Sequence, residues 1–326
     1  MSLVGFWFAA IALLWLGFLF LEGFDFGVAL LLPVLGREEG QRSQMLRTIG
    51  PVWDGNEVWL ITAVGATFAA FPGWYASWLS SSYLLFLAIL LGLIVRAVGF
   101  EWRHAHHSTS WESRWSTAIV GGSLLAAAGV GAALGAATLG LPLDADGNRV
   151  GGPLAWLSWG AVLGAIATVA YCVVHGAIFL ALKTQAPLRH EAVQAARRVL
   201  PLAAVPLLAW GAIVQLRSGT PLTGALWTLG PVAAGYAWWR LGRGREGHAF
   251  LGWAALLVAS LGTIFAAAWP VVLASTAGPD LTAYATTVSH KTLTIMTWLA
   301  AFGLPVTLAY QAWTYWVFRR RIGASP

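Results

Sequence analysis

Nine long apolar stretches dominate the chain, and short polar segments separate them. A helix needs about 20 residues, rising about 1.5 Å each, to cross the apolar core of a membrane. Each stretch comes close to that length or exceeds it, so we expect nine membrane-spanning helices. Their expected ranges are about Gly5–Leu35, Gly50–Phe71, Tyr75–Gly99, Trp115–Leu141, Pro153–Leu182, Val199–Leu216, Leu222–Trp239, Phe250–Ala274 and Ser289–Phe318.

The polar segments between these stretches are short. The longest are 36–49, 100–114, 144–152, 183–198 and 275–288. None has room for a separate catalytic domain outside the membrane. We therefore expect residues 1–326 to form a single integral membrane domain, arranged as two helical bundles plus an extra helix.

The basic residues alternate between the two sides of this expected topology. Fifteen lie in the polar segments after the first, third, fifth and seventh stretches and in the C-terminal tail, and three lie on the opposite side. Cytoplasmic loops carry such an excess of Lys and Arg. The pattern predicts an N-terminus outside and a C-terminus in the cytoplasm. The fifteen are Arg37, Arg42, Arg47, Arg103, Arg114, Lys183, Arg189, Arg197, Arg198, Arg240, Arg243, Arg245, Arg319, Arg320 and Arg321.

Composition agrees with a membrane protein. Apolar residues make up 58% of the chain and charged residues 10%, whereas soluble domains average about 25% charged residues. The fold class is therefore an all-α polytopic membrane protein. The surplus of basic over acidic residues reflects membrane orientation, so we expect no nucleic-acid partner.

The first apolar stretch carries two acids, Glu22 and Asp25. They are three residues apart and therefore share one face of a helix. Gly23 and Gly27 lie on roughly the opposite face, at a spacing that lets a neighbouring helix approach closely. Acidic residues at membrane depth are costly and usually serve a pathway or a site.

The second stretch begins with another pair of acids, Asp54 and Glu57. It runs inward from the expected cytoplasmic side, so Asp54 lies near that surface and Glu57 about one turn deeper. The first stretch runs the other way and places Asp25 and then Glu22 deeper still. If the two helices are neighbours, the four acids form a ladder typical of a proton relay.

A structural explanation of the same acids stays open. Asp54 is close enough to the start of its helix to cap it or to stabilise its dipole. Arg96 lies at a similar depth in the third stretch and could tie Asp54 in an ion pair. Arg96 and Asn56 are the expected structural polar partners of the acids.

Metal or haem ligands at membrane depth are scarce in the sequence. Of seven histidines only His175 lies well inside an apolar stretch, and a lone histidine is more often a satisfied core residue. His104, His106 and His107 cluster in a polar segment without a ligand set of known spacing. We expect no metal site, no axial haem ligands and no catalytic residues in this chain.

Several motifs together resemble subunit II of the bacterial cytochrome bd-type quinol oxidases. The most specific is W-D-G-N-E-V-W-L at Trp53–Leu60, beside E-G-F-D-F-G at Glu22–Gly27 and R-A-V-G-F-E-W-R at Arg96–Arg103. Further matches are Phe68–Pro72, Leu293–Trp298 and Tyr310–Trp316. The similarity is strong over the first hundred residues, loose in the middle and strong again in the ninth stretch.

The resemblance implies a haem-free subunit of a terminal oxidase in the bacterial cell membrane. In that family subunit I, the partner in a heterodimer, carries two haems b and one haem d and oxidises quinol, while dioxygen is reduced to water. Subunit II is expected to support assembly and to supply a proton path through Asp54, Glu22 and Asp25. The family can also hold a structural quinone, bound lipid and small accessory subunits, which the motifs do not locate.

A proton-coupled secondary transporter is the alternative function. Acids within the membrane and apolar stretches interrupted by Gly or Pro would suit it. No clear pair of matched interrupted helices accompanies them in the sequence.

Overall fold

The structure is a computed structural model that describes residues 2–103, 105–106 and 108–323. It is built of helices, with one small two-stranded sheet. The elements are α1 (Leu3–Leu35), α2 (Glu39–Ile49), α3 (Trp53–Ala70), α4 (Pro72–Ser81), α5 (Tyr83–Trp102), α6 (Thr109–Leu139), α7 (Trp159–Lys183), α8 (Leu188–Ser218), α9 (Pro221–Leu241), α10 (Glu246–Ala268), β1 (Val271–Leu273), β2 (Leu281–Thr282), α11 (Ala283–Thr286) and α12 (His290–Val317).

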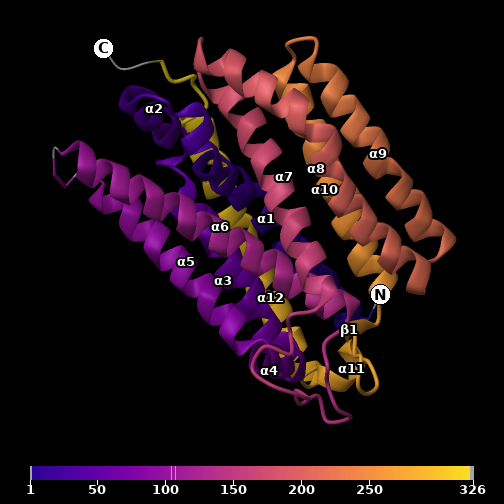
Figure 1. Ribbon diagram of the computed structural model, residues 1–326. Coiled ribbons are helices and arrows are strands. Elements are labelled where there is room, and N and C mark those ends of the chain that lie inside the picture. The colour runs from indigo at the N-terminus through magenta and orange to yellow at the C-terminus, as the bar shows by residue number, and fades with distance from the viewer. Residues whose placement is uncertain (1, 104, 107, 324–326) are drawn as a thin grey trace.

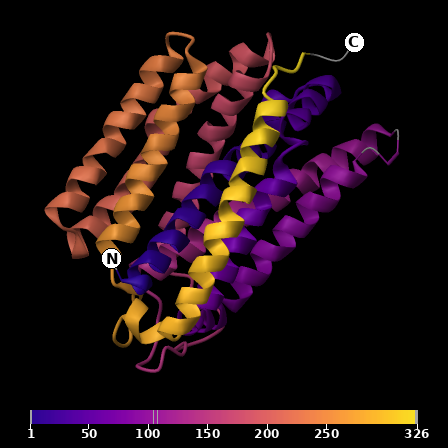
Figure 2. The same ribbon diagram turned by 180° about the vertical axis from the view of Figure 1, so that it is seen from behind.

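Helix α1 lies at the centre of the molecule (Figure 1). It packs against α3 and α6 in one bundle, which α5 completes, and against α7 of a second bundle formed with α8, α9 and α10. Helix α12 crosses the outside of α1 and α3 (Figure 2), and Leu293 is its one buried residue. The arrangement is therefore two bundles joined along α1 and α7, with α12 added on one face.

Seven of the described helices are long and apolar enough to cross a membrane, which confirms a polytopic membrane protein. Eight of the nine expected stretches each correspond to one helix, and the third is divided between α4 and α5. Of the helices in these stretches, α3, α4 and α9 are not long or apolar enough to count as spans. The seven are α1, α5, α6, α7, α8, α10 and α12.

The prediction of one continuous helix over Tyr75–Gly99 is wrong. Two helices replace it, because α4 ends at Ser81 and α5 starts at Tyr83. Helix α4 begins at Pro72, where the fixed φ of proline suits the first turn of a helix. The residue before a proline is pushed out of the helical region, so α3 ends at Ala70.

Two segments expected to be polar loops are largely helical. Helix α2 occupies most of 36–49, and α8 starts at Leu188 inside the segment 183–198. The early turns of α8 bury Leu188, Ala192 and Ala196 at helical spacing, so the basic residues there form only the other face. Helix α10, which corresponds to the eighth expected stretch, ends at Ala268 rather than Ala274, because β1 pairs with β2 beyond it.

Opposite ends of the bundle differ in charge. Helix α2, the turns joining α7 to α8 and α9 to α10, and the C-terminal end of α12 lie at one end, and α4, β1 and α11 lie at the other (Figure 1). The first end carries most of the basic residues counted above.

Candidate functional site

The two faces of α1 are used as its sequence predicts. Gly23 faces Tyr171 and Cys172 of α7, and Gly27 lies directly against the backbone of Cys172 and Gly176. Any side chain at Gly27 would overlap the Cys172 carbonyl group. Glycine is therefore required for this close crossing of α1 and α7.

Arg96 of α5 is the centre of a buried ion cluster on the acidic face of α1. Its Nη1 donates to Oε1 of Glu22 and, at 2.8 Å, to Oε1 of Glu57 on α3. Arg96 and Glu22 are completely buried, and the Glu57 side chain is 19% exposed. Three helices are thus joined by one guanidinium, which also lies 4.8 Å from the ring centroid of Phe26.

The structure pairs Arg96 with Glu57 rather than with Asp54. Among the described residues no ion pair joins Asp54 to Arg96, so that expected tie is wrong. The reason is depth, because Glu57 lies almost one turn farther into the membrane than Asp54 and reaches the level of Arg96. The helix cap is also elsewhere, since the N-cap of α3 is Val52. Asp54 lies in the first turn and is exposed.

Asn56 organises a second set of contacts next to the ion cluster. Its Nδ2 donates to Oδ2 of the buried Asp25 at 2.6 Å. Its Oδ1 accepts from Nε2 of Gln311 at 3.1 Å and from the hydroxyl of Tyr315 at 2.8 Å, both on α12. Asn56 thereby joins α1, α3 and α12, a larger role than the polar partner expected from sequence.

Gln311 and Tyr315 are site residues that we did not single out from sequence. Both belong to Tyr310–Trp316, one of the stretches that carry the family resemblance. A polar pair four residues apart on one face of an otherwise apolar helix could have indicated a buried partner. Their target on α3 needs the fold.

The four acids expected in the ladder form one connected electrostatic group. Asp25 interacts electrostatically with Glu22, Glu57 and Arg96, and Glu57 interacts with Asp54. The series runs from the exposed Asp54 through the partly buried Glu57 to the buried Glu22 and Asp25. α1 and α3 are neighbours, as the ladder requires.

Several atoms of this group keep unused hydrogen-bonding capacity. Within the described part of the chain, Oε2 of Glu22, Oδ1 of Asp25, and Nε and Nη2 of Arg96 are buried without a hydrogen-bond partner. The carboxyl groups of Glu22, Asp25 and Glu57 lie around the single guanidinium of Arg96. The net charge of this group is zero when two of the three carboxyl groups carry protons. The arrangement can therefore hold protons on groups that remain free to form further hydrogen bonds.

His175 lies in a separate aromatic environment between α1, α7 and α10. It is buried, and its Nε2 is 2.9 Å from the carbonyl oxygen of Phe20. Its ring stacks on that of Phe250 with 4.5 Å between the ring centroids. No group of three or more His, Cys, Asp and Glu residues that could hold a metal is found in the described ranges. His104 and His107 of the expected histidine cluster lie outside the described residues.

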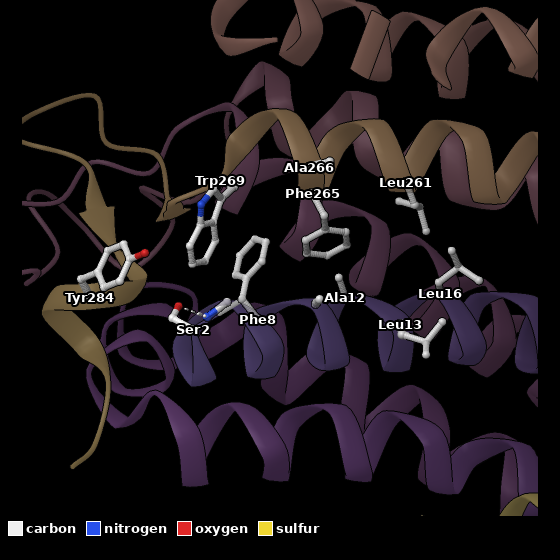
Figure 3. A pocket seen from close by; sticks show the side chains of 13 residues that line it. Ser2, Phe8, Ala12, Leu13, Leu16, Leu261, Phe265, Ala266, Trp269 and Tyr284 are labelled. Carbon is white, nitrogen blue, oxygen red and sulfur yellow. Dashed lines mark hydrogen bonds between the residues drawn. The ribbon is translucent and has the colours of Figure 1, made fainter. Parts of the chain in front are cut away.

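A cavity of about 650 Å³ lies between the start of α1 and the end of α10 (Figure 3). Phe8, Phe265 and Trp269 point into it, and Ser2 and Tyr284 supply hydroxyl groups at one end. The cavity therefore has apolar, aromatic walls and a polar end.

Comparison with known proteins extends the resemblance to nearly the whole chain. Residues 3–318 match the family described as cytochrome bd terminal oxidase subunit II. The chain is 34% identical over 328 residues to cytochrome bd ubiquinol oxidase subunit 2 of Bacillus subtilis, covering 98% of this chain and 97% of that protein. It is 30% identical over 357 residues to cytochrome bd-I ubiquinol oxidase subunit 2 of Escherichia coli, with 97% and 94% covered.

The fold is also similar to a solved structure. A chain of the bd oxidase from Geobacillus thermodenitrificans superposes with a TM-score of 0.78, covering 98% of this chain and 99% of that one, at 18% identity. The motif-based resemblance is confirmed by these matches.

Proposed function

The chain belongs to the cytochrome bd terminal oxidase subunit II family, and from that premise we propose how it serves its complex. It is a multi-pass bacterial membrane protein and a subunit of a respiratory oxidoreductase. The complex oxidises quinol and reduces dioxygen to water. The match over residues 3–318 is the observation that carries this function.

The partner is subunit I, with which this chain forms a heterodimer. We assign the two haems b, the haem d and the quinol chemistry to that partner, and we assign to this chain a supporting role in its assembly. Metal-ligand clusters do not occur among the described residues here, which is compatible with that division. The quinone pool and oxygen are then substrates of the complex, and lipid and small accessory subunits are further neighbours.

The four acids Asp54, Glu57, Glu22 and Asp25, together with Arg96, form the proposed proton path from the cytoplasm. Asp54 takes up protons at the surface, Glu57 is next inward, and Glu22 and Asp25 hold protons in the interior. Arg96 holds the carboxyl groups together and compensates the charge of one of them, while protons on the other two keep the group neutral. Asn56 orients Asp25, and the unpartnered oxygens of Glu22 and Asp25 are the atoms on which protons can arrive and leave.

The topology that this path needs is nine spans in one integral membrane domain, residues 1–326, with the N-terminus outside. Two observations support it. Helices occupy all nine expected stretches, the third being divided between α4 and α5, and the basic loops lie at the end of the bundle where α12 ends (Figure 1). Positive residues favour the cytoplasmic side.

The cavity beside Phe8, Phe265 and Trp269 is the proposed place of a structural quinone. Its volume of about 650 Å³ is in the range of small-molecule sites, and its walls are apolar. Residues of α1 and α10 would hold the ring there. Its described lining includes no Asp, Glu, His or Lys side chain, so we take the quinone to be structural.

The alternative of a proton-coupled transporter is not favoured, because the family match covers the chain almost end to end. Affinity purification of the tagged chain from its native membrane tests the proposal. We expect a haem-bearing partner to co-purify, with the visible reduced-minus-oxidised bands of haems b and d. A chain that purifies alone, and whose deletion leaves quinol oxidase activity intact, would refute it.

A further inference from the structure

A second cavity, of about 450 Å³, opens between α1, α7, α10 and α12 at the basic end of the bundle. Its walls are aromatic. Phe24 stacks on Phe179 with 4.0 Å between ring centroids, and Phe20 and Phe250 lie beside them. Such walls suit an acyl chain.

Cationic groups surround the mouth of this cavity. Lys183 lies at the end of α7, and Arg319 and Arg321 follow α12. The Lys183 ammonium donates to the carbonyl oxygens of Phe318 and, at 3.3 Å, Arg320. These bonds hold the end of α12 against α7 and leave the positive charge uncompensated.

Arg321 is held in the same way. Its Nη1 donates to the carbonyl oxygens of Ala181 at 3.1 Å and Thr184 at 2.8 Å. Its Nη2 is 3.7 Å from Oε2 of Glu246, and Arg189 also binds that carboxylate at 2.5 Å. Of the described acids, only Glu246 is paired with any of the three cations, so the mouth keeps a net positive charge.

We propose that this cavity binds one anionic phospholipid. The phosphate lies between Lys183, Arg319 and Arg321, and an acyl chain runs along Phe20, Phe24 and Phe250. Ammonium and guanidinium groups have several donors each, so the bonds to backbone carbonyls leave donors for phosphate. A neutral lipid or a quinone would also fit the apolar walls, but it would supply no negative group to pair with the three cations.

This site goes beyond the proposed function, because it needs neither the proton path nor the quinone cavity. Each basic residue at a membrane surface raises the affinity for anionic lipid by about fivefold. The walls add an apolar contact that an exposed basic patch lacks. The lipid would join α1, α7 and α12 where these helices reach the surface.

Native mass spectrometry of the purified oxidase complex tests the site. The complex is delipidated and offered phosphatidylglycerol or phosphatidylcholine with identical acyl chains. The variants are Lys183→Gln with Arg319→Gln, which removes charge, and Leu182→Trp, which fills the cavity without changing charge. The control is Arg243→Gln with Arg245→Gln, an equal loss of charge at the same end of the bundle.

We expect the wild-type complex and the control to retain one phosphatidylglycerol in preference to phosphatidylcholine. Both test variants should lose it, the charge variant by about 25-fold. Retention of the two lipids to the same extent, or retention of phosphatidylglycerol by the charge variant to the same extent as by the wild type, would overturn the proposal. Displacement of the lipid by inorganic phosphate alone, or retention of a neutral quinone in its place, would also overturn it. If the charge variant does not assemble, the Leu182→Trp complex decides by the same criterion.

Discussion

Asn56 of α3 donates a hydrogen bond of 2.6 Å to Oδ2 of Asp25 on α1. The same amide accepts bonds from Gln311 and Tyr315 of α12. One side chain therefore joins α1, at the centre of the fold, to α12 on one face of the molecule, and it fixes the orientation of a buried carboxyl group.

Replacing Asn56 by Leu should destabilise the complex and loosen α12. Asp25, Gln311 and Tyr315 each lose a buried partner, and an unsatisfied buried polar group costs about 1–3 kcal/mol. Thermal unfolding of the purified complex measures the loss. Tyr315→Phe should cost about 0.5–1.5 kcal/mol, whereas Tyr310→Phe on the exposed part of the same helix should have no effect. Equal effects of the two tyrosine variants would contradict this role.

Arg96→Met should have the largest effect on stability. It leaves Glu22 and Glu57 without their cation, and breaking a buried ion pair from one side costs about 3–5 kcal/mol. The measurement is assembly and thermal stability of the complex. Adding Glu22→Gln to Arg96→Met should restore part of the loss, because the stranded charge is removed. Arg114→Gln, on the exposed face of α6, is the matched control. A stable Arg96→Met complex would show that the cluster is not a structural centre.

Gly27→Ala should separate α1 from α7. The new methyl group meets the backbone of Cys172 and Gly176, and overpacking of a tight core costs about 1–3 kcal/mol. Gly121→Ala in α6 has open space around it and serves as the control. Unfolding temperatures that fall equally in the two variants would refute the close crossing.

The sequence predicts much of this arrangement and misses particular contacts. Hydrophobic length located the helices, and the spacing of Glu22, Asp25, Gly23 and Gly27 predicted both faces of α1. The predicted partner of Arg96 was wrong. The choice between Asp54 and Glu57 depends on their depth relative to Arg96, and the sequence does not define the ends of the two helices closely enough to give that depth. The role of α12 was missed because its contact with Asn56 joins residues more than 250 positions apart.

Asp54→Asn should slow oxygen reduction without loss of haem. Asp54 is exposed and outside the ion pairs of Arg96, so its removal should change stability by less than about 1 kcal/mol. Positioned proton-transfer groups contribute about 10²–10⁴ in rate, so we expect a loss of at least about tenfold. Oxygen consumption with excess quinol measures it. The control is Glu101→Gln, an exposed acid near the end of α5, which should keep wild-type turnover. Wild-type turnover in Asp54→Asn would remove this residue from the path.

In the proposed function, the protons for water formation pass through the acids of this chain. Proton uptake during the reaction of the fully reduced complex with oxygen, followed with a pH-sensitive dye on the cytoplasmic side of reconstituted vesicles, tests it most directly. Asp25→Asn keeps the size of its side chain and removes its ability to carry a proton. We predict that this variant assembles with its haems and takes up protons at least about tenfold more slowly than the wild type. Uptake at the wild-type rate in a fully assembled Asp25→Asn complex would show that the protons do not pass through Asp25.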